Sequence, residues 1–97
     1  MMELNNLINT IDYKGLQKKT IIKDANLEQF VVCLEKGAEM PKHITPIKAQ
    51  LLVLEGTVTY CIDGDEIILS KHQHFTIPKD EIHWMVALEN SKFIVTR

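Results

Sequence analysis

Short apolar runs, separated by turn-forming residues about every 8 to 12 positions, fill the sequence from Gln17 onward. The runs read KKTIIKD, LEQFVVCLEKG, AQLLVLEG, TVTYCIDGDEIILS, QHFTIPKDEIHWMVAL and SKFIVTR. Asp63-Gly64 divides one of them and favours a two-residue β-hairpin, because both residues tolerate a positive φ. Pro41 and Pro46 are interpreted as breaks before the third run. The pattern predicts about seven or eight strands in an antiparallel sandwich or barrel.

Alternation within the runs assigns side chains to faces. Val58, Tyr60 and Ile62 share one face of their strand, and Thr57 and Thr59 lie on the other. The run LLVL at positions 51–54 is continuously apolar. We therefore expect that strand to be covered on both sides, by the core and by either an N-terminal segment or a second subunit.

The N-terminal part, residues 1–16, has a different pattern. Leu4, Leu7, Ile8 and Ile11 fall at helical spacing, which fits either a short helix or an irregular arm. With 97 residues the chain is expected to form one domain, with this arm preceding a barrel over residues 17–97.

Charge and composition limit the classes of partner that we expect this protein to bind. The net charge is −2, and no basic cluster indicates binding to nucleic acid or to anionic lipid. No apolar run approaches the roughly 18 to 20 residues of a membrane span, and the N-terminus lacks a secretion-signal pattern. We expect a cytoplasmic protein without nucleic-acid or membrane partners, in which Cys33 and Cys61 are reduced thiols in the core.

Two motifs, with their spacing and their order along the chain, resemble those of a known protein family. The first places His43 after a glycine and five residues, and the second ends at His83. In full the positions are Gly37, His43, Thr45, Ala49 and Gly56, then His72, Pro78, Asp80 and His83. This order, with the Asp63-Gly64 hairpin between the motifs, resembles the small single-domain cupins, from about Thr20 to Arg97. The resemblance implies an all-β, RmlC-like antiparallel jelly-roll barrel.

The departures from the family's motifs bear on function. Metal-dependent cupins use three His and one Glu, and the resemblance carries only His43 and His83 over as ligands. Thr45 replaces the second His and Ala49 the Glu, although Gln50 would stand in for the Glu if the strand were shifted by one residue. Such a shift would turn its side chain to the opposite face. The segment HITPIKAQLLVLEG looks like that of a subset of very small cupins without the standard metal site.

The candidate pocket follows from His43 and His83. If both point into the barrel, alternation sends Thr45, Ala49 and Met85 the same way, with Met40 at the mouth and Gln50 as the alternative polar group. Such a lining is largely apolar with a few polar groups, as in small-molecule sites. Alternatively, the side chains simply fill a small barrel.

Three further features stay open. His72 and His74 suit the rim or surface, an adventitious metal contact or a pocket role. Trp84 should face away from His83, either at a dimer contact beside the apolar LLVL run or in packing beneath the arm. A homodimer is expected.

We predict a small-molecule-binding or sensing module with an incomplete metal site. The alternative is an enzyme, either metal-assisted (an isomerase or oxygenase) or using His43 or His83 as general base. A third reading is a stable barrel that associates with another protein. The first reading is metal-free or weakly metal-binding, and the alternative includes a bound Zn, Fe, Ni or Mn at His43 and His83.

Overall fold

A computed structural model describes residues 2–97 and shows one short helix and nine strands within that range. The elements are α1 (Leu7–Thr10), β1 (Leu16–Lys23), β2 (Glu28–Leu34), β3 (Glu39–Ile44), β4 (Ala49–Glu55), β5 (Thr57–Ile62), β6 (Asp65–Ser70), β7 (His74–Ile77), β8 (Ile82–Ala87) and β9 (Ser91–Thr96). The predicted hairpin at Asp63-Gly64 joins β5 to β6, and both residues have positive φ.

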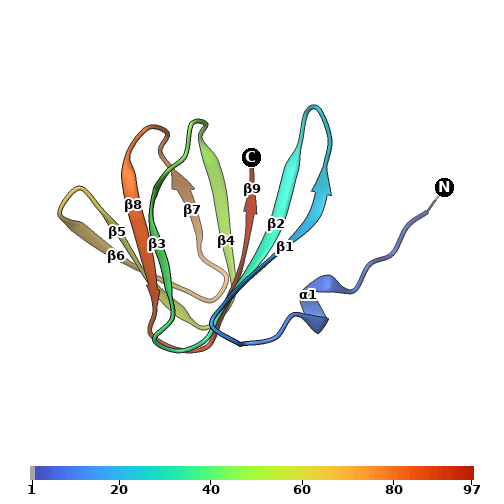
Figure 1. The fold of residues 1–97 in the computed structure, drawn as a ribbon, viewed down its shortest axis with the longest axis horizontal. Coiled ribbons are helices and arrows are strands. Elements are labelled where there is room, and N and C mark those ends of the chain that lie inside the picture. Colours follow the sequence, from blue (N-terminus) through green and yellow to red (C-terminus); the bar gives the residue numbers. More distant parts are fainter. Residues whose placement is uncertain (1) are drawn as a thin grey trace.

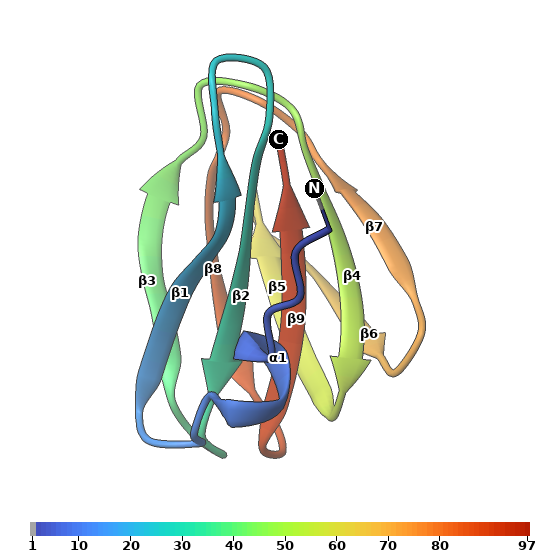
Figure 2. The ribbon, with the colours of Figure 1, turned by 90° about the vertical axis from the view of Figure 1, so that its right-hand side faces the viewer.

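The strands form two facing antiparallel sheets (Figures 1 and 2). The five-stranded sheet has the order β1-β2-β9-β4-β7, and the four-stranded sheet the order β3-β8-β5-β6. The jumps from β2 to β9 and from β3 to β8 bring distant parts of the sequence side by side. The antiparallel all-β architecture expected from the apolar pattern is confirmed, and so is the jelly roll that the resemblance implied.

The strand missed by the sequence pattern is β3, which contains Pro41. Proline cannot donate to a sheet ladder, so it is tolerated mainly on edge strands and at bulges. Here β3 is an edge strand, and its pairing with β8 is irregular between Met40 and His43. The interpretation of Pro41 as a break was therefore wrong, and β3 carries His43.

The core lies between the two sheets and follows the predicted alternation. Val58 and Tyr60 are fully buried in it, and Ile62 packs against it. On β4, Leu51 and Val53 point inward, whereas Leu52 is 39% exposed on the outer face. The N-terminal segment therefore does not cover Leu52 on the outer side of LLVL.

The N-terminal arm covers β2 instead. It has one turn of helix, α1, and is otherwise irregular. Buried Ile11 packs with Val31 and Cys33 on the outer face of the five-stranded sheet. The Lys92 ammonium, itself buried, donates to the Ile8 carbonyl at 2.6 Å. Because both faces of β2 are covered, its run FVVCL is buried throughout.

The outer faces of the two sheets carry different apolar residues. Trp84 lies on β8, where the Lys42 ammonium stands 4.9 Å from the centre of its ring, and it pairs with Cys61. Leu52 lies on β4 in the other sheet. The expected joint surface of Trp84 and the LLVL run is therefore wrong, and so is packing of Trp84 beneath the arm. Cys33 and Cys61 are buried free thiols, as predicted.

No helix within residues 2–97 is long and apolar enough to cross a membrane.

Candidate functional site

His43 and His83 face each other across the β3–β8 ladder. They are directly paired in register, and their ring centroids are 4.2 Å apart in an edge-to-face arrangement at 64°. His83 is 1% exposed, and His43 is half-buried. The sequence prediction that these two distant histidines point together into the barrel agrees with this geometry.

Both imidazoles are oriented by the backbone in the same way. The Nδ1 of His43 lies 2.8 Å from the Pro41 carbonyl oxygen, and that of His83 lies 3.0 Å from the Glu81 carbonyl oxygen. Because a carbonyl oxygen only accepts, each Nδ1 carries a hydrogen and donates it. In the neutral rings the lone pair then lies on Nε2, which is left free to accept a hydrogen bond or a proton.

His83 sits in the less polar surroundings of the two. Burial lowers its pKa from the ordinary 6.5, opposed by the hydrogen bond to Glu81 and assisted by neighbouring His43. Its ring stacks on Tyr60 at 5.3 Å, and Tyr60 in turn contacts Phe75 on the opposite sheet at 4.6 Å. Burial therefore favours the neutral form of the His83 imidazole, which is held between aromatic neighbours.

The other predicted pocket residues divide into two groups. Met40, Thr45, Ala49 and Met85 line a cavity together with the two histidines, as expected. Gln50 does not, because its side chain lies on the outer face of β4 and accepts a hydrogen bond from Thr76 Oγ1 at 2.8 Å. The cavity volume is about 20 Å³, which holds roughly one water molecule. In this conformation side chains fill most of the barrel.

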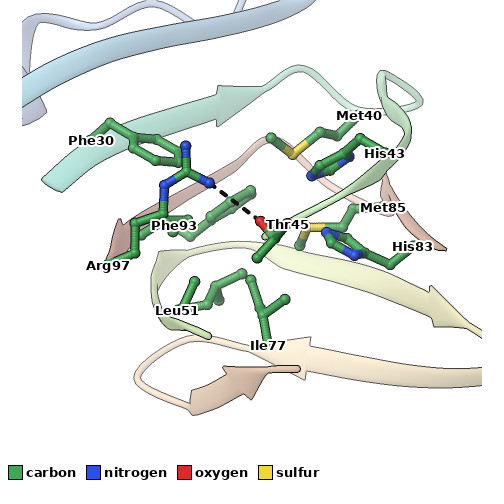
Figure 3. Close-up of a pocket in the computed structure, with 12 residues that line it drawn as sticks. Phe30, Met40, His43, Thr45, Leu51, Ile77, His83, Met85, Phe93 and Arg97 are labelled. Carbon is green, nitrogen blue, oxygen red and sulfur yellow. Dashed lines mark hydrogen bonds between the residues drawn. The ribbon is translucent and has the colours of Figure 1, made fainter. Parts of the chain in front are cut away.

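Arg97 is a lining residue that the sequence reasoning missed. Its Nη1 donates to Thr45 Oγ1 at 3.3 Å, and its Nε donates to Glu28 Oε1 at 2.6 Å. Figure 3 shows the guanidinium with Phe30 on one side of the cavity and the two histidines on the other, with Thr45 between them. A signal was available: Arg97 follows Phe93 and Val95 at intervals of two, so alternation places it on the same inward face.

His72 and His74 lie away from this cavity. Both are exposed; His72 occupies the turn before β7 with a φ of 69°, and His74 begins β7 opposite Leu52. Neither side chain lines the cavity, so the structure favours the surface interpretation of the HQH sequence.

The donor set does not complete a metal site. Among residues 2–97, no group of three or more His, Cys, Asp or Glu side chains is arranged to hold a metal ion. The cavity offers two imidazole nitrogens, and Thr45 already accepts a hydrogen bond from Arg97. Since protein zinc and iron sites generally use three or four protein ligands, these residues do not fit a resident catalytic metal by themselves.

Comparison with known proteins agrees with this architecture. The family profile described as a cupin domain matches residues 30–96. This chain belongs to the cupin family. No curated protein sequence matches it significantly.

Solved structures of other cupins have the same fold. An RmlC-like cupin from Desulfovibrio desulfuricans is 22% identical, with a TM-score of 0.86 over 99% of this chain and 95% of the other. A conserved protein of unknown function from Streptococcus pyogenes is 21% identical, with a TM-score of 0.84 over 99% and 86%. KdgF from Halomonas sp. is 26% identical, with a TM-score of 0.77 over 91% and 86%. These likenesses establish the cupin fold.

Proposed function

We propose that this cupin is a small-molecule-binding or sensing protein whose ligand donates hydrogen bonds to the Nε2 atoms of His43 and His83. The observation that carries the proposal is the preorganised imidazole pair. Both Nδ1–H groups are fixed on backbone carbonyls, so both Nε2 atoms are available inside a largely apolar lining. A few fixed polar groups in an apolar surround are the usual composition of a small-molecule site.

The size of the cavity constrains this function. About 20 Å³ is far below the roughly 300 to 1,000 Å³ of sites for drug-sized ligands. A ligand larger than water must therefore occupy adjoining space as well. That space is an open groove that shares Phe30, Met40, His43 and Arg97 with the cavity. The expected cytoplasmic location belongs to the same proposal and is supported by the two free thiols.

A second candidate is an enzyme that uses His83 as general base. The depressed pKa of His83 and its oriented Nε2 favour this reading, because such a ring is unprotonated at neutral pH. The metal-assisted version has less support, because the cavity supplies only two imidazole ligands.

The test compares the protein as purified with His83→Ala by native mass spectrometry and elemental analysis. A bound organic mass that disappears in His83→Ala and persists in His74→Ala, an exposed histidine outside the cavity, would support the binding function. A stoichiometric metal lost in His43→Ala and His83→Ala would instead support the metal-assisted enzyme. Bare protein, together with ring signals of His43 and His83 that no member of a small-molecule library shifts, would refute the proposed site.

A further inference from the structure

A groove runs along the seam between the two sheets, where edge strand β1 approaches edge strand β3. Its volume is about 370 Å³, and its apolar part is formed by side chains from both edges. The lining comprises Leu16, Lys18, Phe30, Met40, Pro41, His43, Ile44, Pro46 and Arg97. Because four of these residues also line the inner cavity, the groove adjoins the space below the two histidines.

Two cations converge on one aromatic ring in this groove. The Lys18 ammonium lies 4.1 Å from the centre of the Phe30 ring, and the Arg97 guanidinium lies 5.4 Å from it. Lys18 lies on the inner face of β1, because it pairs with Val32, whose side chain is in the core. Both cations therefore face the seam.

Positive charge is in excess at this point. The groove lining contains no Asp or Glu among the described residues. Arg97 is compensated by Glu28, which is also 3.6 Å from Lys23. Lys18 makes no direct salt bridge within residues 2–97, and its charge interacts with the Glu28 carboxylate only at longer range. A mainly apolar groove with an ammonium that has no direct ion pair, beside a guanidinium, suits an anion with an apolar body.

We propose that the ligand is a small organic carboxylate, whose anionic group lies between Lys18 and Arg97 and whose apolar body extends along the seam so that its far end reaches the Nε2 atoms of His43 and His83. This inference rests on the proposed binding function and specifies its ligand class. Guanidinium groups bind carboxylates through paired N–H donors, and Nη2 of Arg97 has no protein acceptor within the described chain.

Three probes with the same six-carbon chain test whether the groove prefers an anionic ligand. They are hexanoate, 1-hexanol and hexylammonium. Binding is followed by chemical shifts of the amide groups and of the His43 and His83 rings. Hexanoate should bind about ten-fold more tightly than 1-hexanol, and hexylammonium should bind most weakly, because a charge-assisted hydrogen bond in a partly exposed groove supplies about that factor. The preference should shrink in about 0.5 M salt.

Lys18→Glu should reduce hexanoate affinity at least ten-fold. Lys19→Glu makes the same change one residue away, on the outer face opposite Val31, and should leave the affinity within about two-fold. Both lysines are exposed, so neither variant disturbs the core. Equal binding of hexanoate and 1-hexanol, unaffected by Lys18→Glu, would overturn the carboxylate class while leaving a small-molecule site at the histidines supported.

Two other outcomes would also overturn the inference. If no probe shifts the groove amides and these amides are protected from hydrogen exchange in a dimer, a second copy of the chain occupies the seam. If hexanoate shifts only residues outside the groove, the anion site lies elsewhere. The native mass measurement on His83→Ala then decides the proposed function separately.

Discussion

Gly56 occupies the tight connection between β4 and β5, and its neighbours leave no room for a side chain. Its φ is +80°, and an added Cβ would collide with the Asn90 carbonyl oxygen and Ser91 Oγ and lie 2.8 Å from Ser91 Cα. Gly64 has nearly the same φ, +81°, but apart from its own atoms and those of its two chain neighbours, no described atom lies within 4 Å of its Cβ position. Substituting each glycine by alanine therefore distinguishes the free-energy cost of backbone strain from that of steric collision.

Gly56→Ala should lower the free energy of unfolding by about 3 kcal/mol or more, because backbone strain and overpacking add. Gly64→Ala should cost only about 1 kcal/mol, from the left-handed backbone alone. Urea unfolding of both variants measures the difference. Equal losses would mean that the connection after β4 relaxes to accept a methyl group.

Tyr60 carries a buried hydroxyl for which the described residues offer no hydrogen-bond partner. Burial raises its pKa to about 12, and the Glu81 carboxylate adds to the shift. Removing an unsatisfied buried hydroxyl is neutral or favourable, so Tyr60→Phe should keep or raise the free energy of unfolding by up to about 1 kcal/mol.

Tyr13→Phe provides the matched comparison, since the Tyr13 hydroxyl donates to the Glu55 carboxylate. This variant should lose about 0.5 to 1.5 kcal/mol. Denaturant unfolding at pH 7 tests both. A clear loss of stability in Tyr60→Phe would show that the hydroxyl has a partner in solution, such as a bound water or ligand.

His83 should make stability depend on pH. Burial lowers its pKa in the folded protein below the ordinary 6.5, so the unfolded chain binds the proton more tightly. The stabilising contribution is complete above about pH 6.5 and is lost as pH falls from 6.5 through the folded-state pKa. Wild-type protein should therefore have a lower Tm at pH 5.5 than at pH 7.5, and His83→Gln should show a smaller difference.

His74→Gln serves as the control because His74 is exposed, and its pH dependence should match that of wild type. If His83→Gln retained the full difference in Tm, another group would be responsible. Glu28 also titrates abnormally, since Arg97 holds the pKa of its carboxyl below 4.5. Its stabilising contribution is lost at lower pH than that of His83, so the two effects are separable.

At the scale of elements, the N-terminal arm is held on the outer face of the five-stranded sheet by few contacts. Ile11 is its buried apolar residue, and it covers the thiol of Cys33. Burial raises the pKa of that thiol, partly offset by Lys92. Ile11→Ala should cost about 2 to 4 kcal/mol and loosen the arm.

A thiol reagent reports this loosening directly. Cys33 should react several-fold faster in Ile11→Ala, while Cys61, buried on the other sheet, keeps its rate. Leu4→Ala, which alters an arm residue that is 98% exposed, should change neither rate. Parallel acceleration of both cysteines would indicate global unfolding and contradict a separately mobile arm.

The same elements show which parts of the structure can be predicted from sequence. Strands with alternating or continuous apolar residues, such as β5 around Tyr60, were predicted because local periodicity encodes them. By contrast, β3 carries two exposed polar residues and Pro41, and its strand conformation depends on pairing with β8. The same limit applies to the site: motif spacing identified His43 and His83, whereas the contact of Arg97 with Thr45 depends on two strands meeting across the fold.

For the whole molecule, the two outer faces differ in their exposed apolar surface. The outer face of the four-stranded sheet carries Ile68, which is 61% exposed, and Ile44 and Ile82, each 55% exposed. Trp84 lies between them, half-buried. On the outer face of the five-stranded sheet, Leu52 is 39% exposed and lies between exposed His74 and half-buried Ile94. Exposed apolar residues that gather on one face are typical of interaction sites.

We therefore expect the predicted homodimer to form through the four-stranded sheet. Ile68→Glu places a charge in that apolar interface and should convert the dimer to a monomer in sedimentation velocity at micromolar concentration. Leu52→Glu makes an equivalent change on the opposite face and should leave the dimer intact. A monomeric wild-type protein would refute the dimer, and monomers formed by Leu52→Glu alone would place the interface on the five-stranded sheet, beside LLVL.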